Sequence, residues 1–203
     1  MPQQQGIIHG PLTTGVLHLC IDMQNLFGED SPWNVPWFRL IIPPVVEICR
    51  RHAQSTIFTR FIPPASPLDA VGAWKRYYNK WADLTLEHID PMLLELAPPL
   101  REFIPPARVL DKSVYSPWTE GRLQGYLQGN RIHTLVITGA ETDLCVLAGL
   151  LGAVDRGYRV IIVSDAVCST SDQSHDAILS LCHKRFSEQL EVISTQELCA
   201  AWP

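Results

Sequence analysis

The sequence predicts one α/β domain built on a doubly wound parallel sheet. Three observations lead to this fold class: six short apolar runs recur along the chain, helical stretches separate them, and 203 residues are enough for a single core. The runs lack strict alternation of apolar and polar residues, which is typical of parallel strands buried on both faces. Strands that alternate with helices favour right-handed crossovers and helices on both sides of the sheet.

The expected elements follow in chain order. Strands are expected at residues 16–21, 56–59, 108–110, 134–138, 159–164 and 190–194. Helices are expected at residues 45–54, 120–129, 142–155, 173–186 and 195–202. Sheets of this kind bind ligands beyond the carboxyl ends of their strands, at the switch in strand order. Functional residues are therefore expected directly after the apolar runs.

The segment 61–106 interrupts this alternation and is interpreted as an insertion. It is rich in proline and aromatic residues and is too long for a plain connection. A helix is expected over residues 69–85, where four aromatic residues recur at spacings of three to four: Trp74, Tyr77, Tyr78 and Trp81. This helix either packs on the domain as an ordinary amphipathic helix, covers the site as a lid, or forms a subunit interface.

Composition excludes several classes of partner and compartment. The net charge is −5 and no basic stripe is present, so nucleic acid is not an expected partner. No apolar run approaches the roughly 20 residues that span a membrane, and the first residues, 1–14, resemble a loose N-terminal arm rather than a secretory signal. The six scattered cysteines form no CxxC pair, which argues against a zinc site and favours a reducing cytoplasm. We expect a single domain over residues 1–203.

Three polar residues follow apolar runs on the same expected edge of the sheet. Asp22 follows the first run, Lys112 follows the third, and Cys145 lies in the first turn of the helix after the fourth. Each residue taken alone is more often structural: a buried small side chain, a turn residue or a solvated lysine. Their convergence at the edge where α/β sheets bind ligands indicates a catalytic site.

The chemistry expected of this group is nucleophilic. Thr142 or Asp143 is expected to cap the helix that carries Cys145, and the helix dipole and Lys112 are expected to lower the pKa of the thiol. Asp22 would accept the thiol proton and later pass it to the leaving nitrogen. Rival motifs are missing from the sequence: it has no GxSxG and no GxGxxG, and Leu151 stands where a cysteine phosphatase needs arginine.

The stretches LCIDMQNLF, VLDKSVYSPW and VITGAETDLCVLAGLL resemble the isochorismatase-like cysteine hydrolases, a group that includes nicotinamidases and N-carbamoylsarcosine amidase. The resemblance covers nearly the whole chain after Gly15 and is weakest across 61–106. It implies a three-layer α/β/α sandwich around a six-stranded parallel sheet. It also implies a catalytic triad of Asp22, Lys112 and Cys145.

The same resemblance implies a non-proline cis peptide between Ala140 and Glu141. The backbone N–H groups of Glu141 and Cys145 would then form an oxyanion hole, and the reaction would pass through a thioester. Metal-binding nicotinamidases carry Asp-x-His after the second strand, where this chain has Thr-Arg-Phe-Ile at 59–62. We therefore expect no metal and no cofactor.

Six residues near the strand ends are expected to contact a small-molecule substrate: Gln24, Phe27, Phe61, Trp74, Tyr115 and Trp118. The leading hypothesis is an amidohydrolase that cleaves a C–N bond of a small amide, ureide or carbamoyl compound. An isochorismatase-type hydrolase of another metabolite and a catalytically silent binding or scaffold protein are the alternatives. The family implies a homodimer or homotetramer.

Overall fold

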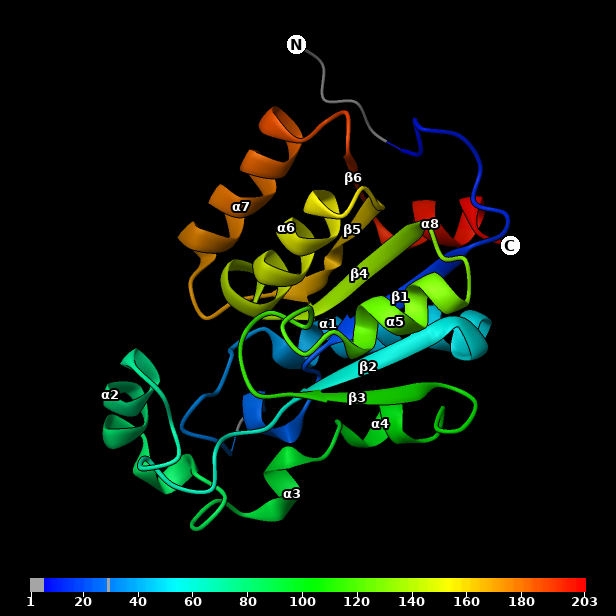
Figure 1. Ribbon diagram of the computed structural model, residues 1–203. Coiled ribbons are helices and arrows are strands. Elements are labelled where there is room, and N and C mark those ends of the chain that lie inside the picture. Colours follow the sequence, from blue (N-terminus) through cyan, green and yellow to red (C-terminus); the bar gives the residue numbers. More distant parts are fainter. Residues whose placement is uncertain (1–5, 29) are drawn as a thin grey trace.

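The computed structural model describes residues 6–28 and 30–203, and its centre is a parallel sheet of six strands (Figure 1). The strand order is β3-β2-β1-β4-β5-β6, and every neighbouring pair is parallel. The strands are β1 Val16–Ile21, β2 Thr56–Phe61, β3 Arg108–Lys112, β4 Thr134–Ala140, β5 Arg159–Cys168 and β6 Leu190–Ile193. The predicted fold class, a six-stranded parallel sheet between two layers of helices, is confirmed.

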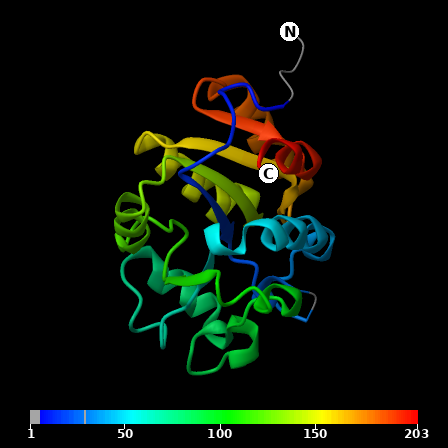
Figure 2. The same ribbon diagram turned by 90° about the vertical axis from the view of Figure 1, so that its right-hand side faces the viewer.

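Two separate apolar cores hold the helices to the two faces of the sheet. Ile57 and Phe58 are neighbours on β2, yet they belong to different cores because successive side chains of a strand point to opposite faces. On the Phe58 side lie α1 (Phe38–His52), α4 (Pro98–Arg101) and α8 (Thr195–Ala201). On the Ile57 side lie α5 (Arg122–Gly129), α6 (Leu147–Asp155) and α7 (Asp172–Arg185). Figure 2 shows α1 and α8 on one side of the strands and α5 on the other.

Helix α1 begins well before the predicted start at residue 45. Pro43 and Pro44 lie inside α1, although proline in a helix interior removes a backbone hydrogen bond and disfavours the helix. Phe38, Ile41 and Val45 are buried on the inner face of the helix, while the prolines lie outward. We infer that burial of this apolar stripe outweighs the cost of proline within a helix, about 3 kcal/mol each.

The insertion contains less helix than the aromatic spacing predicts. The expected helix over 69–85 is reduced to α2, Ala73–Lys80, followed by a 3-10 turn at Ala82–Leu84. Gly72, with φ of 55°, starts α2, and Asp69 instead accepts hydrogen bonds from Ser66 in the preceding turn. The rest of the insertion forms α3 (Pro91–Leu94) and α4. In Figure 1 the part with α2 and α3 extends from one end of the sheet.

The N-terminal arm is not loose over the part that the structure describes. The backbone N–H groups of Ile8 and His9 donate to Glu191, Arg159 donates to the carbonyl of Gly10, and Leu12 is buried. The expectation of a loose arm is therefore wrong for these residues, because a carboxylate and a guanidinium at the sheet edge hold the backbone. Residues 1–5 of the predicted arm lie outside the described residues. No helix within 6–28 and 30–203 has the length and hydropathy needed to cross a bilayer.

Candidate active site

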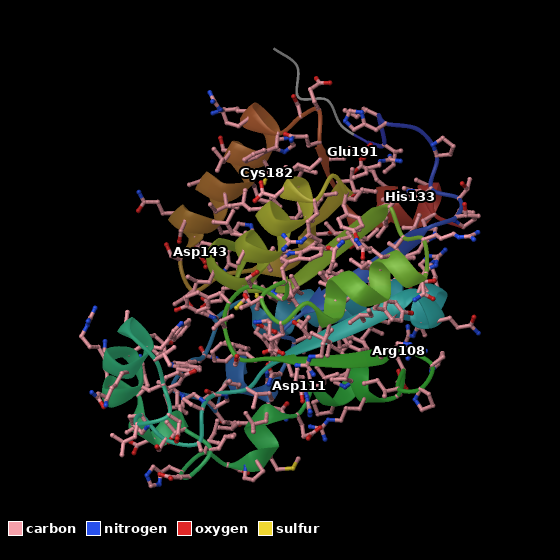
Figure 3. The ribbon with its side chains drawn as sticks, in the orientation of Figure 1. Arg108, Asp111, His133, Asp143, Cys182 and Glu191 are labelled. Atoms are coloured by element: carbon pink, nitrogen blue, oxygen red, sulfur yellow. The ribbon has the colours of Figure 1, made fainter. Side chains whose placement is uncertain are left out.

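The strand order places the switch point of the sheet between β1 and β4. The chain leaves the carboxyl end of β1 toward one face and that of β4 toward the other, and such a divergence leaves a crevice in which α/β sheets bind ligands. Figure 3 shows Asp111 and Asp143 toward this edge, on the side where α2 lies, and Arg108 and His133 toward the opposite edge.

Asp22, Lys112 and Cys145 meet at this edge as the strand-end pattern predicts. The Nζ atom of Lys112 lies 2.6 Å from Oδ2 of Asp22 and 3.5 Å from Sγ of Cys145. Lys112 ends β3, two strands away from β1, so its long side chain passes the end of β2 to reach Asp22. The three side chains are buried, with relative exposures of 0%, 2% and 5%. They form one cluster that contains a carboxylate, an ammonium and a thiol.

Two residues that the sequence interpretation missed hold Asp22 in place. The hydroxyl of Thr59, on β2, donates to Oδ1 of Asp22 at 2.5 Å, and the backbone N–H of Asp22 donates to Thr59. Gly139, on β4, has a φ of 112°, and a Cβ atom there would lie 1.9 Å from the carbonyl oxygen of Ile21. Only glycine permits this close approach of β4 to the end of β1. Two features of the sequence could have pointed to these residues. Gly139 is a glycine inside an apolar strand, and Thr59 is a polar residue at the end of a predicted strand.

Burial and charge set the protonation of the cluster. Burial by itself lowers the pKa of Lys112, but the Asp22 carboxylate and the Cys145 side chain outweigh it and raise that pKa. Burial and the neighbouring Asp22 carboxylate raise the pKa of the Cys145 thiol well above its usual value, against the opposing effect of Lys112. The expectation of a lowered thiol pKa is wrong for the free protein. The resting cluster is therefore a neutral thiol beside an ion pair of Asp22 and Lys112.

The turn that carries Cys145 is a π-helix, Thr142–Val146, rather than the first turn of an α-helix. Neither expected cap forms: the hydroxyl of Thr142 hydrogen-bonds to Nδ1 of His175 at 2.9 Å, and Asp143 accepts from Ser169 at 2.5 Å. These contacts connect the turn to α7 and to the end of β5. We infer that they fix the direction of the cysteine, because both partners come from outside the turn.

The peptide bond between Ala140 and Glu141 is cis. It lies between the end of β4 and the π-helical turn, at the position that the resemblance implies for the oxyanion hole. The backbone N–H of Thr170 donates to the carboxylate of Glu141 at 2.8 Å. The hydroxyl of Thr170 also donates to this carboxylate. The Glu141 side chain is thus engaged with the loop after β5, while its backbone borders the turn of Cys145.

Aromatic side chains from the insertion and from the segment after β3 lie beside the cluster. Nζ of Lys112 lies 5.0 Å from the centre of the Phe61 ring, which is 6.5 Å from the ring of Tyr115. The Trp74 ring lies 4.9 Å from that of Tyr115. Burial raises the pKa of Tyr77, and the neighbouring Tyr115 and Cys145 side chains add to that effect. Three predicted substrate residues, Phe61, Trp74 and Tyr115, therefore lie beside the cluster, and Tyr77 is a neighbour that the sequence interpretation did not assign to the site.

The other three predicted substrate residues are occupied by packing. Gln24 accepts from the backbone of Phe61 and donates to the carbonyls of Phe61 and Leu94, so its amide joins β2 to the insertion. Phe27 is buried in the core on the α1 side. The indole N–H of Trp118 donates to the carbonyl of Gly149 at 2.8 Å, and its ring packs in the opposite core. Direct substrate contacts are therefore not assigned to these three residues.

A cavity of about 350 Å³ adjoins the cluster between the insertion and the end of β3. It reaches Lys112, Tyr78 and Trp74, whereas Asp22 and Cys145 are buried and do not line it. The volume falls within the range of small-molecule sites, roughly 300–1,000 Å³.

Metal-ligand chemistry is not evident in the part of the chain that the structure describes. No group of three or more His, Cys, Asp or Glu side chains there is placed to hold a metal ion. At the segment where nicotinamidases carry Asp-x-His, Thr59 holds Asp22 and Arg60 is bound to Asp111 by two hydrogen bonds. The expected lack of a metal stays a prediction.

Comparisons with known proteins were made for sequence and for fold. A family model described as "Isochorismatase domain" matches residues 16–197. Nicotinamidase 3 of Arabidopsis thaliana is 27% identical over 164 residues, which cover 79% of this chain and 77% of the relative. A cysteine hydrolase from Pseudomonas syringae pv. phaseolicola 1448A has a TM-score of 0.84 at 21% identity, covering 99% of this chain and 98% of that one. N-carbamoylsarcosine amidase from Thermoplasma acidophilum has a TM-score of 0.72 at 19% identity, covering 90% and 97%.

Proposed function

The chain belongs to the isochorismatase family of hydrolases, and on that premise we propose that it is a cysteine-dependent amidohydrolase. The substrate class is a small amide, ureide or carbamoyl compound, whose C–N bond is cleaved with Cys145 as the nucleophile. One observation carries the proposal: a buried ammonium, Lys112, lies 2.6 Å from the carboxylate of Asp22 and 3.5 Å from the thiol of Cys145. Nicotinamidase and N-carbamoylsarcosine amidase among the similar proteins support the same class of bond.

The first half of the reaction forms a thioester. The thiol is neutral at rest, so Asp22 accepts its proton as the sulfur attacks the substrate carbonyl carbon. Backbone N–H groups of Glu141 and Cys145 stabilise the oxyanion that develops on the carbonyl oxygen. The C–N bond then breaks, and Asp22 returns the proton to the leaving nitrogen. Ammonia or an amine departs, and the acyl group stays on Cys145.

The second half releases the acid. Water attacks the thioester carbonyl while Asp22 accepts one of its protons. The C–S bond then breaks, and Asp22 passes that proton to the departing sulfur, which restores the thiol and releases the acid. Lys112 keeps its positive charge throughout, because its pKa is raised and two acidic partners contact it. Its role in this scheme is electrostatic: the ammonium offsets the negative charge that passes between Asp22, Cys145 and the substrate oxygen.

Two other functions predict different behaviour. An isochorismatase-type hydrolase of another small metabolite would not need the thiol, and a silent scaffold protein would need none of the three side chains. The burial of Lys112 and Asp22 disfavours the scaffold, because an ion pair taken out of water contributes little net stability.

A screen for ammonia release tests the proposal. Small amides, ureides and carbamoyl amino acids are incubated with the protein and with its Cys145→Ala and Cys199→Ala variants. We expect the parent and Cys199→Ala to release ammonia from the same compounds and Cys145→Ala to release none. Hydroxylamine added during turnover should yield the hydroxamate of the acyl group, since it competes with water for the thioester. Full activity of Cys145→Ala would exclude the nucleophile and favour the isochorismatase-type alternative.

A further inference from the structure

The hydroxyl of Tyr78 is a buried polar group with no hydrogen-bond partner in the described part of the chain. Tyr78 lies on α2, its side chain is 1% exposed, and no hydrogen-bond partner is present among the described residues. Buried hydroxyls in folded proteins are nearly always hydrogen-bonded, because leaving one unpaired costs free energy. A phenylalanine would fill the same space without that cost. The hydroxyl therefore calls for an explanation other than packing.

Tyr78 lies close to both the cavity and the Cys145 side chain. Its ring packs against Trp74 and Tyr77, at centroid distances of 6.0 and 5.3 Å. Tyr78 lines the cavity together with Lys112 and Trp74. The Cys145 side chain is near enough to add to the effect of burial on the pKa of Tyr78. The Tyr78 ring therefore lies on the wall of the same cavity that Lys112 of the cluster reaches.

We infer that Tyr78 is a specificity-determining residue, whose hydroxyl binds a polar atom on the part of the substrate that does not react. The inference rests on the proposed function and extends it to the choice of substrate. Burial and the neighbouring Tyr77, Tyr115 and Cys145 raise the pKa of Tyr78, so the hydroxyl stays protonated and acts as a donor. Its partner on the substrate is then an acceptor: a carbonyl oxygen, an ether oxygen or a ring nitrogen.

The charges around the cavity define the substrate class further. Three carboxylates line it, Asp69, Asp111 and Glu120, against two cations, Lys112 and Arg122. Lys112 is paired with Asp22, and Arg122 is paired with Glu120. Asp111 is likewise paired with Arg60, so these charges largely offset one another. An anionic substrate would find both cations that line the cavity already engaged.

The aromatic walls complete the assignment. Phe61, Trp74, Tyr77 and Tyr115 offer flat apolar surfaces beside the cluster. The expected substrate is therefore an uncharged compound with a planar body, an amide or ureide to be cleaved, and a separate hydrogen-bond acceptor.

The variant Tyr78→Phe tests this role because it removes only the hydroxyl. Its matched control is Tyr158→Phe, since the Tyr158 hydroxyl accepts from Gln124 in the opposite core. We expect Tyr78→Phe to lower kcat/KM about tenfold for uncharged amides with a second acceptor and to leave kcat/KM unchanged for matched amides without one. The melting temperature of the free protein should stay equal or rise. Tyr158→Phe should lower the melting temperature and leave the selectivity unchanged.

An equal loss of activity on both kinds of amide, or a lower melting temperature for Tyr78→Phe, would overturn the inference, because either result indicates a structural hydroxyl. A binding measurement separates this inference from the proposed function. Calorimetry of Cys145→Ala with the same compounds should show weaker binding of the acceptor-bearing amides once Tyr78→Phe is added. If that holds while the parent protein hydrolyses no amide, recognition by Tyr78 stands and the proposed reaction fails. Binding that is unchanged, or not detected for any compound, overturns the inference.

Discussion

Asp22 and Glu191 are both buried carboxylates of the same sheet, and each is paired with a basic side chain, but they lie at opposite edges. Glu191, near the start of β6, receives two hydrogen bonds from Arg159 and two more from the backbone of Ile8 and His9. Figure 3 shows Glu191 far from Asp111, which lies toward the carboxyl ends of the strands, where Asp22 also lies. These partners of Glu191, a guanidinium and two backbone N–H groups, do not give up their protons at ordinary pH. The contacts of Glu191 therefore stabilise the fold and attach the N-terminal segment.

Asp22 differs from Glu191 in the kind of partner that it has. Thr59 and Lys112 hold its carboxylate, and its third neighbour is the thiol of Cys145, which carries a transferable proton. Burial and ion pairing therefore do not by themselves distinguish Asp22, the carboxylate that we propose to be catalytic, from the structural Glu191. The difference between them is that Asp22 has a neighbour able to exchange a proton with it.

The largest expected effect comes from removing that group. Cys145→Ala should reduce amide hydrolysis by at least about 10³-fold, because no nucleophile remains, while the ion pair of Asp22 and Lys112 stays intact. Steady-state rates and thermal unfolding of the same preparation measure both effects. A variant with lost activity and a strongly lowered melting temperature would indicate that the thiol is a packing residue.

Breaking the ion pair of Asp22 and Lys112, which we propose to be catalytic, should affect both activity and stability. Lys112→Ala leaves the carboxylate of Asp22 buried without its cation, which typically costs about 3–5 kcal/mol of unfolding free energy. Chemical denaturation measures that loss, and residual ammonia release measures the activity. A stability equal to that of the parent would contradict the account of Lys112 as the charge partner of Asp22.

Breaking the structural ion pair should affect stability alone. Arg159→Ala removes two hydrogen bonds from Glu191 and one from the carbonyl of Gly10, and we expect a loss of about 2–3 kcal/mol. The kcat/KM should stay within about twofold of the parent value, because the pair lies at the far edge of the sheet. A tenfold loss of activity would show that the two edges are coupled.

The smallest effect concerns pH. Burial by itself raises the pKa of Glu191, but the hydrogen bonds from Arg159, His9 and Ile8 outweigh it and lower that pKa. The stabilisation is therefore complete above the usual glutamate pKa and is lost as pH falls through the lower value of the folded protein. Melting temperatures of the parent and of Glu191→Gln, followed from neutral pH to about pH 3, should converge in acid. A gap that stays constant would contradict the assignment.

The pair of Asp22 and Lys112 should respond at the opposite end of the pH scale. The pKa of Lys112 is raised, so the contribution of its charge is complete below the usual lysine pKa and is lost only as pH rises through the higher folded value.

The sequence predicts that the three residues we propose to be catalytic lie together, but it does not predict their electrostatics. Asp22, Lys112 and Cys145 follow apolar runs, and parallel strands end at one edge, so local pattern was enough to bring them together. The direction of the Cys145 pKa depends on burial and on the distance to Asp22, which only the folded chain determines.

Packing residues were the other limit of prediction. Trp118 and Tyr115 follow Lys112 closely in sequence, yet one donates to α6 in the core and the other faces the cluster. Spacing from a strand end does not determine which side chain turns inward. The helix through Pro43 and Pro44 shows the same limit, because tertiary burial outweighed a local rule.

The most direct test of the central claim is the alkylation rate of individual cysteines. The protein is treated with iodoacetamide near neutral pH, and the label is mapped by mass spectrometry over time. Cys199 is more exposed than Cys145, so exposure alone predicts that Cys199 reacts first. The account predicts that Cys145 reacts first although its resting thiol is neutral, because Asp22 removes the proton as the sulfur attacks, and that Asp22→Asn, which lacks this base, slows only that reaction. Faster labelling of Cys199, or a Cys145 rate that Asp22→Asn leaves unchanged, would contradict Cys145 as the activated nucleophile.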